Sequence, residues 1–172
     1  MLGPAAPGVP AGDGADGGAA VTLLTPELAA RIGEERVYTA PEPLGRAAIR
    51  YFALATGDTD PAHLAGDVAP PTLICETNQY AGLPRDADGY AGHGWHLDVP
   101  GTRLVRGGNA YRFERPVGPD DVITARWKLA DMAERVTGGG KTMLIVTSVA
   151  TYTDQAGRVL AVNEETLIYV AR

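Results

Sequence analysis

The second half of the chain is dominated by runs rich in valine, isoleucine, threonine and aromatic residues, a composition typical of β-strands. Clusters of glycine, proline and aspartate interrupt these runs. Strands joined by such short turns pair antiparallel, so the pattern predicts an antiparallel sheet. Trp127 alternates with apolar positions and is expected in the core. The predicted strands cover residues 110–117, 122–132, 142–152 and 159–170, with turns at 118–121, 138–140 and 154–157.

The first half of the chain shows helical spacing instead. Ile49, Phe52 and Ala53 recur on one helical face, which predicts an amphipathic helix over residues 43–56. A second, more buried helix is predicted over residues 71–81, with prolines at its start and a glycine after its end. Helices followed by a sheet predict an α+β fold, in which the 71–81 helix packs across one face of the sheet.

Two shorter elements are predicted ahead of these helices. Thr25, Pro26 and Glu27 provide a hydroxyl cap, a proline at the first helical position and an acid in the first turn of a short helix. Gly33 ends that helix, and residues 36–40 then predict a brief strand.

The first twenty residues differ in composition from the rest of the chain. Residues 1–20 contain fifteen glycine, alanine or proline residues, so they cannot bury enough apolar surface to offset the entropy lost on ordering. We therefore expect a disordered tail at 1–20. We expect one domain over 21–172, because 172 residues are too few for two domains of ordinary size.

Charge and hydropathy limit the partners and the location that we expect. The formal net charge is −6 and the isoelectric point is near 5.0, which argues against binding to nucleic acid or to an anionic membrane. The sequence shows no apolar run of roughly 18 residues and no secretion signal, so we expect a cytoplasmic protein. Cys75 lies in an apolar run and is expected to be a small buried side chain rather than a reactive thiol.

A carboxylate and an imidazole stand five positions apart in residues 55–63, Ala-Thr-Gly-Asp-Thr-Asp-Pro-Ala-His. His63 can take or give a proton near neutral pH, and Asp58 can orient the ring, share a water with it or act as a second acid or base. The same residue types also form ordinary turns. Because the segment follows the predicted 43–56 helix, we expect this turn or acid/base pair at the C-terminal end of a helix.

Two other segments carry candidate chemistry. Residues 138–142, Gly-Gly-Gly-Lys-Thr, imitate the end of a phosphate-binding loop, but a β run follows them and a hairpin tip is the better interpretation. The long loop 82–102 contains two histidines and an aspartate, whose loose spacing does not indicate a metal site, and we expect no metal. Trp95 in this loop is interpreted either as a substrate-covering residue or as simple surface structure.

Three ordered motifs give the chain a resemblance to a known family. Over roughly residues 24–170 the chain resembles the MaoC-like hot-dog hydratase/dehydratase family, and in particular its N-terminal dehydratase-type domains. The resemblance implies a hot-dog fold, with a long central helix wrapped by an antiparallel sheet, and usually a dimer. The motifs are Gly57-Asp58-x-Asp60-Pro61-x-His63, Val68-Ala-Pro-Pro-Thr-Leu73, and Arg106-Gly-Gly-Asn-x-Tyr-x-Phe-Glu-Arg-Pro-Val117 followed by Gly118-Pro-Asp-Asp121.

The resemblance also implies a reaction and a site. Members reversibly add water to trans-2-enoyl thioesters of coenzyme A or acyl carrier protein, giving (3R)-hydroxyacyl thioesters, and we expect no metal or redox cofactor. The family's catalytic pair maps onto Asp58 and His63. The thioester oxygen is expected at the start of the 71–81 helix, near the amides of Thr72 or Leu73. The other residues expected to contact substrate are Asp60, Pro71, Trp95, Gly107, Gly108 and Asn109.

Two positions depart from the pattern of the family's active members. Asp60 stands where they have asparagine, and its added negative charge is expected to favour protonated His63 and to raise the pKa of one carboxylate. Pro71 stands where they have glycine, and proline has no N–H to donate.

These departures leave two alternatives to an active homodimeric hydratase. The chain can be a non-catalytic subunit that supplies half of an acyl tunnel to a related catalytic subunit in a heterodimer. It can also be the same scaffold redirected, in polyketide-type metabolism, to thioester hydrolysis, isomerisation or cyclisation, because fold does not fix chemistry.

Overall fold

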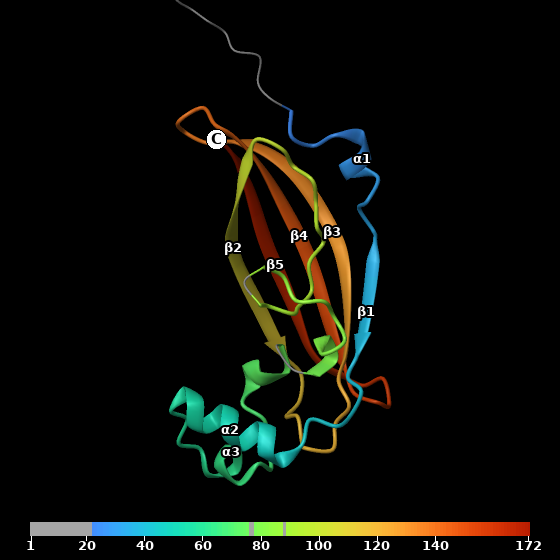
Figure 1. Ribbon diagram of the computed structural model, residues 1–172, viewed down its shortest axis with the longest axis vertical. Coiled ribbons are helices and arrows are strands. Elements are labelled where there is room, and N and C mark those ends of the chain that lie inside the picture. The colour runs from blue at the N-terminus through green and yellow to red at the C-terminus, as the bar shows by residue number, and fades with distance from the viewer. Residues whose placement is uncertain (1–21, 76–77, 88) are drawn as a thin grey trace, which may run out of the picture.

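The structure is a computed structural model that describes residues 22–75, 78–87 and 89–172. The tail predicted at residues 1–20 lies outside the described residues. Within the described ranges, an antiparallel sheet forms the body of the molecule, and short helices lie beyond its ends (Figure 1). The α+β arrangement predicted from the sequence is confirmed.

Five strands in the described part of the chain pair in the order β1-β3-β4-β5-β2, and every neighbouring pair is antiparallel. The last three strands in sequence follow one another through hairpins, as the turn signals predicted. The two earlier strands occupy the edges of the sheet (Figure 1). The strand bounds are β1 Glu35–Thr39, β2 Thr102–Phe113, β3 Thr124–Val136, β4 Thr142–Thr153 and β5 Val159–Ala171.

One face of the sheet, which we call the inner face, carries most of the buried side chains of β3 and β4. Burial alternates residue by residue along β4, as expected for a strand with one covered face. Trp127 on β3 lies opposite Ala150 on β4, and both side chains are buried. The predicted core position of Trp127 is confirmed. The buried inner-face residues of β3 and β4 are Ala125, Trp127, Leu129, Met132, Leu144, Val146, Ser148, Ala150 and Tyr152.

Three α-helices in the described residues are short, and α2 and α3 lie together at one end of the sheet (Figure 1). The predicted cap Thr25 accepts a hydrogen bond from the Leu28 amide and starts α1. Helix α2 buries Ile49 and Ala53 on one face, as their spacing predicted. None of the described helices is long and apolar enough to cross a membrane. The helix bounds are α1 Pro26–Ala29, α2 Arg46–Thr56 and α3 Pro61–Ala65.

The single long helix predicted over residues 71–81 is wrong for the described residues of that segment. They form two short 3₁₀-helices, η1 (Pro71–Cys75) and η2 (Asn78–Tyr80). The Gln79 side chain donates to the Ile74 carbonyl at 2.9 Å, so that carbonyl serves a side chain where an α-helix would use a backbone N–H. Cys75 is buried, as predicted.

Residues 83–87 and 89–99, which include no helix and which we call segment 83–99, lie over the inner face where a long helix was expected. Trp95, Leu97 and Val99 are buried, while His96 and Asp98 between them are exposed. Trp95 is 2% exposed and its indole N–H donates to the Ser148 hydroxyl at 2.8 Å. The interpretation of Trp95 as simple surface structure is therefore wrong.

Candidate functional site

The C-terminal end of α2 holds Asp58 in place. Gly57 ends the helix with a φ of 71°, in the left-handed region that glycine adopts without strain. The Asp58 amide then donates to the Ala53 carbonyl at 2.9 Å, which fixes the first residue after the turn. The predicted place of this segment, at a helix C-terminal end, is confirmed.

The next helix, α3, presents His63 to Asp58. Asp60 starts α3, because its Oδ1 accepts a hydrogen bond from the Ala62 amide at 2.8 Å and Pro61 takes the first helical position. One turn later, Nδ1 of His63 lies 2.7 Å from Oδ2 of Asp58. The structure therefore brings together the two residues that the sequence predicted as a pair.

Asp58 is favoured in its charged form. A hydrogen bond of 2.9 Å from the Asp60 amide, together with the contact to His63, lowers the pKa of Asp58. For Asp58 the expected rise in pKa is wrong, because the backbone of Asp60 faces it while the Asp60 carboxylate caps α3. A charged Asp58 can only accept a hydrogen bond, so it favours the tautomer of His63 that carries its proton on Nδ1. In that tautomer Nε2 is unprotonated.

His63 borders a pocket of about 350 Å³ between α3 and the end of β2. The exposed fractions of the Asp58 and His63 side chains are 25% and 16%, so the pair is partly shielded from solvent. Among the residues that the structure describes, none bonds to Nε2 of His63. Asp60 is not part of this lining, so its predicted substrate contact is replaced by the capping role. The apolar lining consists of Val68, Ala69, Pro71, Phe113, Pro116 and Val117.

The amides predicted to hold the thioester oxygen differ in availability. The Leu73 N–H donates to the Pro70 carbonyl at 3.0 Å, so the prediction of Leu73 as a donor is wrong. The Thr72 N–H has no acceptor in the described part of the chain, and it follows Pro71 of the pocket lining. Because η1 has only five residues, its helix dipole adds little.

An ion-pair cluster fixes one wall of the same pocket. Arg115 lies 3.0 Å from Asp121 and 2.7 Å from Asp154, and Arg158 lies 2.7 Å from Asp154. Burial favours the neutral form of Asp154, but hydrogen bonds from the Arg158 backbone and side chain outweigh it and lower the pKa of Asp154 to about 2. The cluster therefore holds the chain after β2, which brings Val117 into the pocket.

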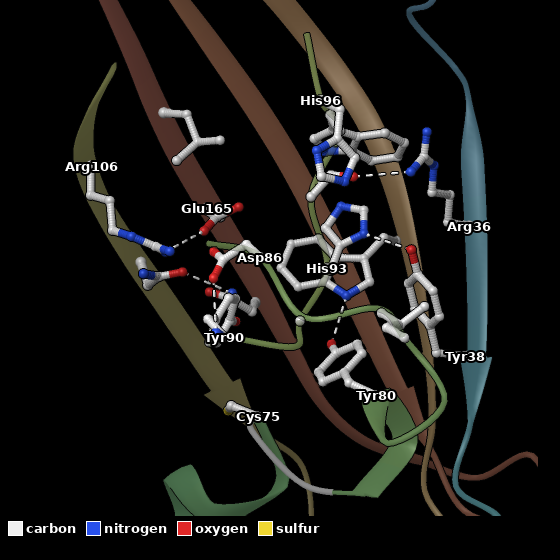
Figure 2. Close-up of a pocket in the computed structure, with 18 of the residues that line it drawn as sticks. Arg36, Tyr38, Cys75, Tyr80, Asp86, Tyr90, His93, His96, Arg106 and Glu165 are labelled. Carbon is white, nitrogen blue, oxygen red and sulfur yellow. Dashed lines mark hydrogen bonds and ion pairs between the residues drawn. The ribbon is translucent and has the colours of Figure 1, made fainter. Parts of the chain in front are cut away.

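A second, larger cavity of about 700 Å³ lies between the inner face and the segment 83–97 (Figure 2). Trp95 and Asn109, both predicted to contact substrate, line this cavity and not the pocket beside His63. The structure therefore distributes the predicted contacts over two places. The aromatic lining includes Tyr38, Tyr80, Trp95, Trp127, Tyr152 and Tyr169.

The predicted contacts Gly107 and Gly108 line neither space. They form a β-bulge in β2, where the pairing with β5 shifts between Arg106 and Gly108. A Cβ at Gly107 would lie 2.9 Å from the Cγ2 atom and 3.1 Å from the carbonyl oxygen of Thr166. These glycines therefore shape the strand instead of contacting a ligand.

His93 is packed among aromatic rings in the larger cavity (Figure 2). Its ring stacks on Trp127 with centroids 4.3 Å apart, and its Nδ1 lies 3.1 Å from the Tyr38 hydroxyl. Burial, helped by the positive charge of Arg36, lowers the pKa of His93 to about 4, so the ring is neutral at pH 7. No group of three or more potential metal-ligating side chains occurs in the described residues.

Sequence reasoning missed the polar side chains that β5 places in this cavity. Asn163 donates through Nδ2 to Oδ1 of Asn109 at 2.9 Å, and Glu165 bonds to Arg106 at 3.3 Å. A signal was present, because Asn163 and Glu165 are polar residues two positions apart in a run predicted as a strand. Two polar residues at that spacing share one face of a strand.

Comparison with known proteins gives a family match and two similar sequences. A family model described as FAS1-like, dehydratase domain region, matches residues 30–163. A UPF0336 protein of Thermobifida fusca is 31% identical over 128 residues, covering 67% of this chain and 79% of that protein. A UPF0336 protein of Clavibacter michiganensis is 29% identical over 157 residues, covering 84% of this chain and 95% of that protein.

Solved structures share the fold at low sequence identity, which confirms the predicted hot-dog fold. A chain of the truncated Mycobacterium tuberculosis HadBC (3R-hydroxyacyl-ACP dehydratase) complex has a TM-score of 0.54 and 23% identity, covering 78% of this chain and 96% of that chain. A chain of the M. tuberculosis ChsH1-ChsH2 complex has a TM-score of 0.58 and 18% identity, covering 77% of this chain and 82% of that chain. A MaoC-like dehydratase from Rhodospirillum rubrum has a TM-score of 0.52 and 20% identity, covering 82% of this chain and 93% of that chain.

Proposed function

We propose a reaction for this chain on the basis of its family, because the chain belongs to the FAS1-like dehydratase domain region family. The proposed reaction is the reversible addition of water to trans-2-enoyl thioesters, which gives (3R)-hydroxyacyl thioesters. The observation that carries this proposal is the 2.7 Å contact between Asp58 and His63 beside a pocket. The acyl group is carried by coenzyme A or by acyl carrier protein.

In the hydration direction, His63 acts as the base. Asp58 accepts a hydrogen bond from Nδ1–H, so the unprotonated Nε2 takes a proton from a water molecule while the water oxygen bonds to C3 of the alkene. The electron pair of the C2–C3 double bond moves toward the thioester oxygen, and C2 then takes a proton from the His63 imidazolium. One water is added and no electrons are gained or lost, so the proposed step needs no metal or redox cofactor.

The negative charge that develops on the thioester oxygen needs a hydrogen-bond donor. The Thr72 amide is the candidate, because it has no acceptor among the described residues and lies next to Pro71 of the pocket lining. A backbone amide that is held in place before reaction costs little reorganisation when the charge appears. Pro71 then serves as an apolar wall, and its missing N–H is replaced by that of its neighbour.

The test is hydration of crotonyl-CoA by the wild-type protein and by H63A and H63Q. We expect wild-type turnover and a loss of kcat of about 10² to 10⁴ in both variants, the range that one general acid/base group contributes. Loss of ultraviolet absorbance by the enoyl thioester gives the rate.

The control for this test is K141A at the exposed tip of the β3–β4 hairpin, which should keep wild-type kcat and circular dichroism. A wild-type protein without turnover on enoyl thioesters of any chain length, whether on coenzyme A or on carrier protein, contradicts the proposal. A folded H63A protein that retains full turnover contradicts the role of His63.

A second candidate function is that of an acyl-binding subunit that completes a site with a related chain. Edge strand β2 favours it, because all twelve of its residues are exposed or half-buried and its outer edge has no partner strand in the described chain. Such an edge favours pairing with another sheet. Mass measurement by light scattering separates the two functions: an active homodimer excludes this candidate, whereas an inactive protein that gains activity with a related chain supports it.

A further inference from the structure

The floor of the larger cavity is polar where the binding surface for a plain hydrocarbon chain would be apolar. Asn109 and Glu165 lie opposite one another on adjacent strands, Asn163 lies two residues from Glu165, and all three line the cavity. Asn163 is 1% exposed. Burial of a polar side chain costs free energy unless its polar atoms are bonded, so any buried polar atom left without a partner here favours a ligand that can bond to it.

Two buried polar atoms of the cavity lining have no hydrogen-bond partner: Oδ1 of Asn163 and Nε2 of His93. In each case the other polar atom of the same side chain is engaged, with Asn109 for Asn163 and with Tyr38 for His93. The Asn163 oxygen is an acceptor only, so a group that bonds to it must be a hydrogen-bond donor. The neutral imidazole can donate or accept, according to its tautomer.

The charged side chains that the sheet contributes to this lining are already compensated. Arg36 donates to Glu34 at 3.0 Å and to the Gly94 carbonyl at 3.0 Å, while Arg106 pairs with Glu165 at 3.3 Å. A group that enters from solution therefore meets hydrogen-bond partners but no uncompensated charge from the sheet. Burial of a carboxylate or ammonium against the sheet would lack a counter-charge, so this wall of the cavity favours an uncharged polar group. The opposite, covering segment contributes Arg85, whose guanidinium donates to the Gly89 carbonyl at 3.2 Å.

Two elements, β2 and η1, contribute residues both to the cavity and to the pocket beside His63. On β2, Asn109 and Tyr111 line the cavity and Phe113 lines the pocket. Alternate residues of a strand share a face, so these three side chains form one row, about 13 Å long at roughly 3.3 Å per residue. On η1, Pro71 lines the pocket and Cys75, at the other end, lines the cavity.

We propose that the larger cavity receives the far end of the acyl chain whose thioester lies beside His63, and that it selects acyl groups bearing an uncharged hydrogen-bond donor, such as a hydroxyl, at that end. This inference rests on the proposed function for the position of the thioester. The donor bonds to Oδ1 of Asn163, the buried acceptor that the protein leaves unpartnered. An unsubstituted acyl chain of the same length leaves that acceptor unsatisfied.

Both tryptophans of the chain, Trp95 and Trp127, line this cavity, so tryptophan fluorescence reports its occupation without turnover. The probes are trans-2-enoyl-CoAs of increasing chain length, each with and without a terminal hydroxyl. At the length that reaches Asn163, we expect the hydroxylated probe to bind wild type about five- to tenfold more tightly, as one additional hydrogen bond allows. In N163L the ratio should fall to about one.

The matched control is N78L. Asn78 also has a buried Oδ1 without a partner, but it does not line the cavity, so N78L should keep the wild-type ratio. The proposal is overturned if wild type shows no preference for the hydroxylated probe at any length. It is equally overturned if N163L keeps the preference, or if N78L loses it to the same extent.

The same measurements separate this inference from the proposed function. If the protein binds hydroxylated probes selectively but hydrates none of them, the proposed function is contradicted and the cavity assignment stands. If the protein hydrates both probe series with equal KM, the proposed function stands and the cavity assignment is contradicted. If no probe of either series binds, both fail.

Discussion

At the scale of single residues, the two carboxylate oxygens of Asp58 make different hydrogen bonds, one within the turn and one with the His63 ring. Its Oδ1 accepts the Asp60 amide at 2.9 Å and its Oδ2 contacts Nδ1 of His63 at 2.7 Å. The two sequence interpretations of this segment, an ordinary turn and an acid/base pair, are therefore compatible. The turn holds the carboxylate still, and a fixed carboxylate can hold the ring in one tautomer.

We predict that D58N lowers kcat by about 10³ to 10⁴ with little change in thermal stability. An asparagine amide can donate to Nδ1, which places the imidazole proton on Nε2 and removes the base, as in a triad whose aspartate is changed to asparagine. Steady-state kinetics and a thermal melt measure the two effects. D60N is the matched variant: asparagine also caps helices, so its kcat should stay within about threefold of wild type. Equal losses in both variants contradict this role.

At the scale of elements, the bulge in β2 decides which side chains reach the inner face. Before it, Arg106 lies opposite Leu167, and after it Asn109 lies opposite Glu165. The extra residue, Gly107, shifts the alternation by one, so even-numbered positions face inward before the bulge and odd-numbered positions after it. Asn109 reaches the cavity floor only because of this shift.

We predict that G107A destabilises the fold by about 1 to 3 kcal/mol, because the added methyl group overlaps Thr166 of the neighbouring strand. The free energy of unfolding in urea measures the effect. G139A at the tip of the β3–β4 hairpin is the control, because its nearest neighbour would be 3.9 Å away and the change should stay within about 0.5 kcal/mol. Equal stability of the two variants would show that the close approach at Gly107 is unimportant.

At the scale of the whole molecule, the inner face packs against a titratable side chain as well as against apolar side chains. The segment 83–99 supplies Trp95 and His93, the sheet supplies Trp127, and together they enclose a neutral imidazole. The charges that act on His93 come from Arg36 and His96, which lower its pKa, and from Glu34, which opposes them. Protonation of His93 is therefore less favourable in the folded chain than in the unfolded chain.

We predict that stability declines as pH falls from 6.5 to 4, and that H93F removes this part of the decline. The folded pKa of His93, about 4, lies below its ordinary value of 6.5, so within this window the unfolded chain binds a proton that the folded chain does not. Acid then favours unfolding, and the effect is complete below pH 4. Melting temperatures across the pH range test this, with K141A as a variant that should keep the slope. An unchanged slope in H93F contradicts the coupling.

The sequence predicted the elements whose signals are local. The last three strands follow from composition and turn residues, and the Asp58 turn follows from a glycine, a cap and a proline within a few residues. The strand predicted over 110–117 is wrong in its bounds and its neighbour, because β2 spans Thr102–Phe113 and pairs with β5 instead of β3. The 71–81 segment failed for a local reason that propensity did not reveal, since the Gln79 side chain competes for the Ile74 carbonyl. The prediction that the Leu73 amide donates to the thioester oxygen is wrong, because this amide already donates a hydrogen bond to the Pro70 carbonyl.

What the sequence determined by itself is the α+β order, the hairpins that join β3, β4 and β5, and the pairing of Asp58 with His63, because each depends on residues close together in the chain. Only the tertiary structure decided that Asn109 meets Asn163, fifty-four residues away, and that His93 stacks on Trp127. Those contacts depend on strand register, on the parity shift at Gly107 and on where segment 83–99 lies. These features are set by pairing between distant segments, and no local pattern encodes them.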